Sequence, residues 1–362
     1  MLNFNSSPDP KESTWSKLSS GLSPEAESVV SSAPTEPYWT ENLLFALYDP
    51  ELDIGFWLHL GTVANDWTMW EERVLVMLPA SEGSLTMWAF HRTVPERRPA
   101  ASNLEFDCVE PFRRWSVRFD GYAVHTTDEE MIAGLSRPGT RRQLVIDLDI
   151  ECVSPIWDAQ TAAVTAGAGA MSAQGWAKDH YEQLYRAAGT VAIDGVVHDF
   201  AGTGWRDHSR GPRGGGAGEA WGGHVIMGGL FPSGRSFVFS RYWRPDGLIT
   251  LEGAAVVDGA NRFHYAKVEA SPRLDMFHMD GERLPVLLHW EDGRLDVECR
   301  TLRSLWTPMR KKYAAAIDME GAALNYALNF SLCCWDDEEA VVYSERSDML
   351  NDPAPELWYA EA

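Results

Sequence analysis

The chain of 362 residues has few cysteines and few basic residues, and both shortages exclude classes of protein. Its five cysteines form no C-x-x-C pair, the spacing found in many zinc sites and thiol oxidoreductases. Lys and Arg number 31 against 53 Asp and Glu, which gives a net charge of −22 and no basic stripe for a phosphate backbone. We therefore expect a cytoplasmic protein with free thiols that does not bind nucleic acid.

Long apolar runs and a secretory signal are also missing. No apolar run reaches the length that spans a bilayer, so we expect no integral membrane association. The N-terminus has no basic stretch followed by an apolar one. It is instead rich in Ser, Pro and Glu, a composition typical of loosely ordered chain. Residues 1–35 are therefore expected to form a flexible segment.

Short runs of alternating apolar and polar residues fill most of the remaining chain. Asp49–Pro50, Asp120–Gly121 and Asp194–Gly195 each stand between two such runs, which is the pattern of a hairpin. A sheet built of such hairpins must hide its edges, and a closed barrel does this best. The length suits two units. We predict an all-β protein with two antiparallel barrels side by side, over residues 36–178 and 179–362.

Helix signals are few. Thr127 and Glu130 have the spacing of a capping box, which predicts the start of a short helix. The small-residue segment 159–175 has the composition of either a helix or a linker.

The segment GTGWRDHSRGPRGGG, residues 202–216, concentrates the chemistry. If it is extended, Asp207 and His208 point to opposite faces, so only one of them faces a given cavity. A carboxyl group among tryptophans is desolvated, which raises its pKa and lets it act as a general acid near neutral pH. The alternative is that Asp207 pairs with Arg206, Arg210 or Arg213 and fixes a turn.

Several other chemistries are disfavoured by the same segment. Adjacent Asp207, His208 and Ser209 cannot fold onto one another as a nucleophilic triad, and no G-x-S-x-G elbow is present. The glycines lack the G-K-[ST] of a phosphate loop. No metal-ligand spacing is evident among the nearby His and Asp residues. We therefore expect neither a metal nor another cofactor.

Polar and aromatic residues around the segment are candidates for binding a substrate. Tryptophans number sixteen, and indoles line pockets for apolar ligands as well as filling cores. Arg206 and Arg213 either hold the loop or bind a polar end of the substrate. The candidate binding residues are Trp205, Arg206, Arg213, Trp221, Tyr242, His180 and Glu182.

The stretch from His180 to Arg213 resembles the AttH-like and carotenoid 1,2-hydratase-like family. The resemblance rests on a glycine, an aromatic residue, D-H-[NS] and a later glycine and arginine, matched here by Gly204, Trp205, Asp207, His208, Ser209, Gly211 and Arg213. It implies two lipocalin-like barrels, with hydratases and cyclases among the relatives and with the motif aspartate as the acid. Arg210 and the glycines 214–216 stand where the family has aromatic residues, which implies a different substrate.

Together these features predict a cofactor-free lyase of the hydratase–dehydratase type, an isomerase or a cyclase. The substrate is expected to be hydrophobic and isoprenoid- or steroid-like. Asp207 is then the general acid, and His208 tunes or orients it. Two alternatives stay open, a carrier of hydrophobic small molecules and a pericyclic cyclase that works by shape. We expect a monomer or a homodimer.

Overall fold

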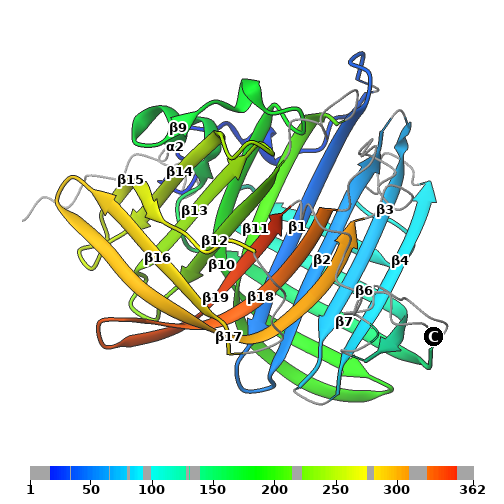
Figure 1. The fold of residues 1–362 in the computed structure, drawn as a ribbon. Coiled ribbons are helices and arrows are strands. Elements are labelled where there is room, and N and C mark those ends of the chain that lie inside the picture. Colours follow the sequence, from blue (N-terminus) through cyan, green and yellow to red (C-terminus); the bar gives the residue numbers. More distant parts are fainter. Residues whose placement is uncertain are drawn as a thin grey trace, which may run out of the picture.

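The computed structural model describes residues 17–32, 34–64, 66–79, 82–92, 99–127, 130, 139–213, 222–274, 281–309 and 324–348. Antiparallel strands dominate these residues and pair into two sheets (Figure 1). The helical elements are short: the 3-10 turns η2 (Pro24–Glu27) and η4 (Met171–Ala173) and the helix α2 (Ala159–Thr165). The prediction of an all-β protein with few short helices is confirmed.

The first sheet closes into a ring of eight strands. Each strand pairs with the next along the chain, and β11 pairs back to β1 to close the ring. The ring strands are β1 (Trp39–Asp49), β2 (Ile54–Val63), β3 (Asp66–Met77), β4 (Ser84–Arg92), β6 (Arg114–Thr126), β7 (Arg141–Cys152), β10 (Asp179–Ile193) and β11 (Val196–Pro212). β5 (Leu104–Glu110) pairs with β6, and β8 (Trp157–Asp158) pairs with β10.

The second sheet is also a ring of eight. Its strands follow chain order, and β13 pairs with β14 so that every strand has two neighbours. The strands are β12 (Gly223–Leu230), β13 (Ser236–Trp243), β14 (Ile249–Val257), β15 (Phe263–Ala270), β16 (Arg283–Trp290), β17 (Gly293–Met309), β18 (Leu324–Trp335) and β19 (Glu338–Asp348). The short β9 (Ala168–Gly169) adds to β14. Two lipocalin-like up-and-down barrels result.

The segment 179–212 lies in the first barrel and not, as predicted, in the second. β10 pairs with β7 and β11, and β11 pairs with β1, so both strands are needed to close the first ring. The small-residue stretch 159–175 suggested a boundary, but its helix α2 is an excursion between β8 and β9. The physical reason is that ring closure pairs strands far apart in sequence, which local patterns do not reveal.

Each barrel has its own apolar interior, and a third apolar cluster joins the two barrels. Alternate residues of a strand point to opposite faces. Thus Leu43 and Phe45 of β1 pack inside the first barrel, whereas Leu44 and Ala46 belong to a cluster that includes residues of both sheets. We call this shared layer, built from the outer faces of both barrels, the seam. In Figure 1 the blue and cyan strands of the first ring lie beside the yellow to red strands of the second.

The turn predictions met different outcomes. Asp194 and Gly195 both have positive φ and join β10 to β11 as a tight hairpin, as predicted. The hairpin at Asp120–Gly121 is wrong, because β6 runs through it and pairs with β7 along that stretch. The capping box is confirmed by two reciprocal hydrogen bonds, from Thr127 N to Glu130 Oε2 (3.1 Å) and from Glu130 N to Thr127 Oγ1 (3.2 Å).

Part of the N-terminal segment packs against the first barrel. Leu18, Leu22 and Ala26 contact Phe112, Ile156 and Tyr181 in a small apolar cluster. Glu27 of η2 is buried. Residues 17–32 therefore contribute to the structure, although the whole stretch 1–35 was expected to be flexible.

Candidate functional site

Strand β11 sends its alternate residues into two different environments. Register pairs Asp207 with Leu44 and Trp205 with Ala46, and both partners belong to the seam. Arg206 and His208 pair with Phe45 and Leu43, which point into the first barrel. The expected separation of Asp207 from His208 is therefore found. Asp207 is the one that faces the second barrel.

Burial dominates the chemistry of Asp207. Desolvation raises the pKa of its carboxyl group to about 7; His180 and Arg213 oppose this rise, and the acidic Glu182 and Glu345 reinforce it. The side chain nevertheless keeps part of its surface exposed. Asp207 makes no ion pair with another residue in the described part of the chain. The contacts thus do not support the alternative that it pins a turn through Arg206, Arg210 or Arg213.

Glu182 lies opposite Asp207 on β10, as part of a buried hydrogen-bonded chain. Trp205 Nε1 donates to Glu182 Oε2 at 3.0 Å, and His180 Nε2 lies 2.8 Å from Glu182 Oε1. Burial raises the pKa of Glu182 well above its usual value and lowers that of His180. Burial thus favours the uncharged form of both groups, and they form a fixed support beneath Asp207.

The second barrel contributes a carboxylate to the same place. Glu345 of β19 accepts a hydrogen bond from Tyr343 Oη at 3.0 Å and lies 3.0 Å from His224 Nε2. Burial raises the pKa of Glu345, but these hydrogen bonds outweigh it and leave the pKa below the usual value. Tyr343 also stacks on Trp205, with ring centroids 5.3 Å apart. A Glu345 that favours the ionised form thus faces Asp207, whose carboxyl group titrates near neutral pH, across the seam.

Three side chains enclose the site. Arg213 follows β11, Trp176 precedes β10, and Tyr242 lies on β13. The Arg213 guanidinium donates from Nε to the carbonyl oxygen of Trp176 (2.8 Å) and from Nη2 to Ser209 Oγ (2.9 Å). The Trp176 ring stacks on Tyr242, with centroids 5.0 Å apart. Tyr242 in turn stacks on His224 at 5.4 Å. Asp207 is among the charged groups that act on the pKa of Arg213 and of Tyr242, so both lie in its surroundings, and their role in binding stays a prediction.

His208 and Arg206 lie elsewhere, inside the first barrel. His208 contacts Glu41 through Nε2 (2.8 Å) and Tyr181 Oη through Nδ1 (2.8 Å). Arg206 donates from Nη2 to Glu27 at 2.7 Å and is fully buried. The structure does not bring either residue to Asp207, because both occupy the opposite face of β11. His180, and not His208, is the histidine that acts on the pKa of Asp207. Trp221 lies outside the described residues.

The family comparison gives one clear result. A family model described as "Domain of unknown function (DUF7064)" matches residues 24–329. The chain belongs to the DUF7064 family. Comparison with curated proteins gives no match.

Among solved structures, this DUF7064 chain is similar to a protein provisionally named AttH from Nitrosomonas europaea. The two are 12% identical with a TM-score of 0.49, over 86% of this chain and 92% of the other. Also similar are CghA with Sch210972 (9% identity, TM-score 0.49, 87% and 89% covered) and kievitone hydratase from Nectria haematococca (7%, 0.44, 86% and 89%).

Two further searches bear on the site. Within the described ranges, no group of three or more His, Cys, Asp or Glu is arranged to hold a metal ion. None of the described helices is long and apolar enough to cross a membrane.

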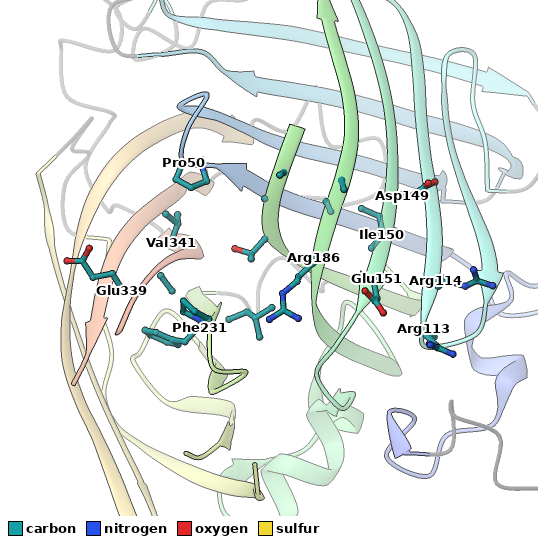
Figure 2. Close-up of a pocket in the computed structure, with 18 of the residues that line it drawn as sticks. Pro50, Arg113, Arg114, Asp149, Ile150, Glu151, Arg186, Phe231, Glu339 and Val341 are labelled. Atoms are coloured by element: carbon teal, nitrogen blue, oxygen red, sulfur yellow. The ribbon is translucent and has the colours of Figure 1, made fainter. Parts of the chain in front are cut away.

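A separate groove of about 1140 Å³ opens where the barrels meet near the β1–β2 turn (Figure 2). Arg186 of β10 and Phe231, which follows β12, approach it from opposite sides, with Val341 of β19 close by. Charged residues of both signs line it, among them Arg113 and Glu151. None of the predicted site residues that the structure describes borders this groove, so it is distinct from the surroundings of Asp207.

Several residues at the seam were missed by sequence reasoning. Glu345, Tyr343 and His224 lie on β19 and β12, and His59 and Trp57 lie on β2. They are far from Asp207 in sequence and carry no local motif. The alternation of β2 could have shown that His59 and Trp57 share a face, but not that this face meets the second barrel.

Proposed function

We propose that this chain is an enzyme of the hydratase–dehydratase, isomerase or cyclase type, with Asp207 as the general acid. The observation that carries the proposal is the pKa of about 7 that burial gives to this carboxyl group. About half of the Asp207 side chains hold a proton at neutral pH, so they can donate it to a double bond or a departing hydroxyl group. Partial exposure gives a substrate access to the acid.

The surroundings of Asp207 suit a hydrophobic substrate that becomes cationic during the reaction. Trp205 and Tyr343 present stacked aromatic faces, and Trp57 belongs to the same apolar cluster. An aromatic face stabilises a nearby cation by roughly 0.5–2 kcal/mol. The ionised Glu345 adds a full negative charge. These features support an isoprenoid- or steroid-like substrate.

The other polar groups position the acid and the substrate. Glu182, held by Trp205 and His180, is coupled to Asp207, and any negative charge on Glu182 raises the pKa of Asp207. Arg213 provides the cation that would bind a polar end of the substrate, and Tyr242 packs beside it. The reaction as proposed uses only these side chains.

The experiment compares Asp207→Asn with Asp199→Asn, which changes an exposed carboxylate on the same strand. Each protein is incubated with a panel of terpenoid and steroid alkenes and alcohols, and mass spectrometry follows the gain or loss of one water. Asp207→Asn should lower turnover 10²–10⁴-fold, while Asp199→Asn should not. Binding without conversion by the unchanged protein would indicate a carrier. A product of unchanged mass, formed equally by Asp207→Asn, would indicate a shape-driven cyclase.

A further inference from the structure

One row of side chains crosses the face of the first barrel that forms the seam. Glu182, Asp207, Leu44, His59 and Arg73 are successive partners on five neighbouring strands. Directly paired residues of antiparallel strands share a face. Asp207 and His59 therefore point to the same side of the sheet, and only β1 separates their strands.

His59 is held in place by its neighbours but is not engaged by hydrogen bonds. Its ring stacks on Trp57 with centroids 5.4 Å apart and planes at 12°. A side chain at Gly61 would displace it, because a Cβ there would lie 2.8 Å from His59 Cε1. No hydrogen bond joins His59 to another of the residues that the structure describes, and Nδ1 is buried without a partner. The side chain keeps part of its surface exposed.

We propose that His59 is a second catalytic residue of the seam, the general base that works with Asp207 in eliminating or adding water. This inference rests on the proposed role of Asp207 as the acid. It narrows the reaction class to one in which the enzyme both gives and takes a proton.

The spacing of the two groups suits this division of labour. Two strand spacings separate their backbones by about 10 Å. For comparison, the two reacting carboxyl groups of inverting glycosidases, which leave room for a water between acid and base, lie roughly 6.5–9.5 Å apart. Leu44, buried between Asp207 and His59, keeps the acid and the base from pairing with each other. Asp207 and His59 thus flank Leu44 on the same face of the sheet, and we expect the substrate to lie between them.

The charges around His59 keep it in the basic, uncharged form. Burial lowers the pKa of His59 well below its usual value, and the positive charges of Arg73 and Arg213 lower it further. Arg73 itself contacts Glu71 on β3. From the second barrel, Tyr326 faces both arginines, and its pKa is raised to a value at which the phenol stays protonated. These influences favour the uncharged imidazole, the form that can accept a proton, and they also make it a weaker base.

The proton balance in the dehydration direction is complete. Asp207 gives its proton to the substrate hydroxyl, the C–O bond breaks, and water leaves. His59 takes a proton from the adjacent carbon, and the electrons of that C–H bond form the double bond. The products are an Asp207 carboxylate and a His59 imidazolium, which exchange the proton through solvent. Hydration reverses each step: the His59 imidazolium gives its proton to the alkene carbon, water adds to the resulting cation, and the Asp207 carboxylate takes a proton from that water.

His180 is the other histidine near Asp207, and its contacts make it unsuitable as the base. Its side chain is almost fully buried, and Nε2 is occupied by Glu182 at 2.8 Å. It supports the acid from beneath and presents no surface to a substrate. His59 has the accessible surface that His180 lacks.

The first test needs no substrate. Diethyl pyrocarbonate modifies neutral, accessible imidazoles, and peptide mapping of the treated protein at pH 7 identifies the modified histidines. His59 should be modified and His180 should be spared. An unreactive His59 would overturn the proposal.

The second test measures turnover for His59→Gln, Asp207→Asn and the control His198→Gln, whose histidine lies on β11 away from the seam residues. The probes are tertiary and allylic alcohols, linalool and α-terpineol among them. His59→Gln should lower turnover 10²–10⁴-fold and remove the acidic limb of the pH–rate profile. Full turnover by His59→Gln with none by Asp207→Asn would overturn the role of His59 as the base and support that of Asp207 as the acid. Full turnover by both variants would overturn both roles.

Discussion

The carboxyl groups of Asp207 and Glu182 occupy directly paired positions on neighbouring strands, and both are desolvated. Two acids so placed do not ionise independently, because each disfavours the charge of the other. Glu182 has two hydrogen-bonding partners, Trp205 and His180, whereas Asp207 has part of its surface exposed. Glu182 is therefore fixed by its hydrogen bonds, whereas Asp207 is the carboxyl group that can act on a substrate.

Stability should fall as pH rises through the titration of Asp207. The folded pKa of about 7 lies above the unfolded value of about 3.9, so the folded state binds more protons between these pH values. The free energy of unfolding then decreases by roughly 4 kcal/mol from pH 4 to above pH 7. Asp207→Asn removes this contribution. Its free energy of unfolding relative to that of the unchanged protein should therefore be higher at pH 8 than at pH 5. Urea unfolding of both proteins at the two pH values checks this; equal pH dependence would contradict it.

Replacing Glu182 should lower the pKa of Asp207. Any negative charge on Glu182 raises the pKa of Asp207, so Glu182→Gln, which cannot ionise, should lower it. Because Asp207 acts in its protonated form, the alkaline limb of the pH–rate profile should move to lower pH. Glu151→Gln, an exposed change on β7, is the matched control. A limb that stays in place in Glu182→Gln would show that the two carboxyl groups are not coupled.

Arg206 should matter for stability and not for catalysis. Arg206→Met leaves the buried Glu27 carboxylate without its cation, which should cost about 3–5 kcal/mol in the free energy of unfolding. The double variant with Glu27→Gln should recover part of that loss, and chemical denaturation measures both. Turnover should be retained under conditions in which the variant is folded. A stable Arg206→Met protein with reduced turnover would instead place Arg206 in contact with the substrate.

Gly61 should set the position of the His59 imidazole. In Gly61→Ala the new methyl group would lie 2.5 Å from Asn42 Oδ1 and 2.8 Å from His59 Cε1, so the ring must move. We expect at least a tenfold loss of turnover with the alkaline limb, which belongs to Asp207, unchanged. Diethyl pyrocarbonate modification of His59 should change in rate. Unchanged turnover and modification would show that the ring position is unimportant.

The sequence predicted the architecture better than the site. Alternation and turn residues such as Asp194–Gly195 were enough for a meander of hairpins that closes on itself, and extended geometry was enough to separate Asp207 from His208. The pairing of β1 with β11 joins residues more than 160 positions apart, as in Leu43 and His208, and decides which barrel the motif strand enters. No local pattern carries that information.

The same limit explains the residues that were missed. Glu345 comes near Asp207 only because two barrels pack outer face to outer face through the apolar seam. His59 comes near it through the pairing of β11 with β1 and of β1 with β2. In the sequence, a carboxylate on a strand with regular alternation cannot be distinguished from a carboxylate that faces solvent. Arg206 was misread for the converse reason, since its buried partner Glu27 comes from a segment with the composition of a flexible tail.

The alternation of β11 also has a genetic consequence. Arg206 and His208 face the interior of the first barrel. Trp205 and Asp207 face the second barrel, so neighbouring positions of β11 have different structural roles. Substitutions at the seam positions can alter which molecule is recognised and leave the interior that folds the barrel intact. A one-residue insertion or deletion would exchange the two sets at once. Lineages of this protein should therefore diversify by substitution on these strands and confine changes of length to the turns.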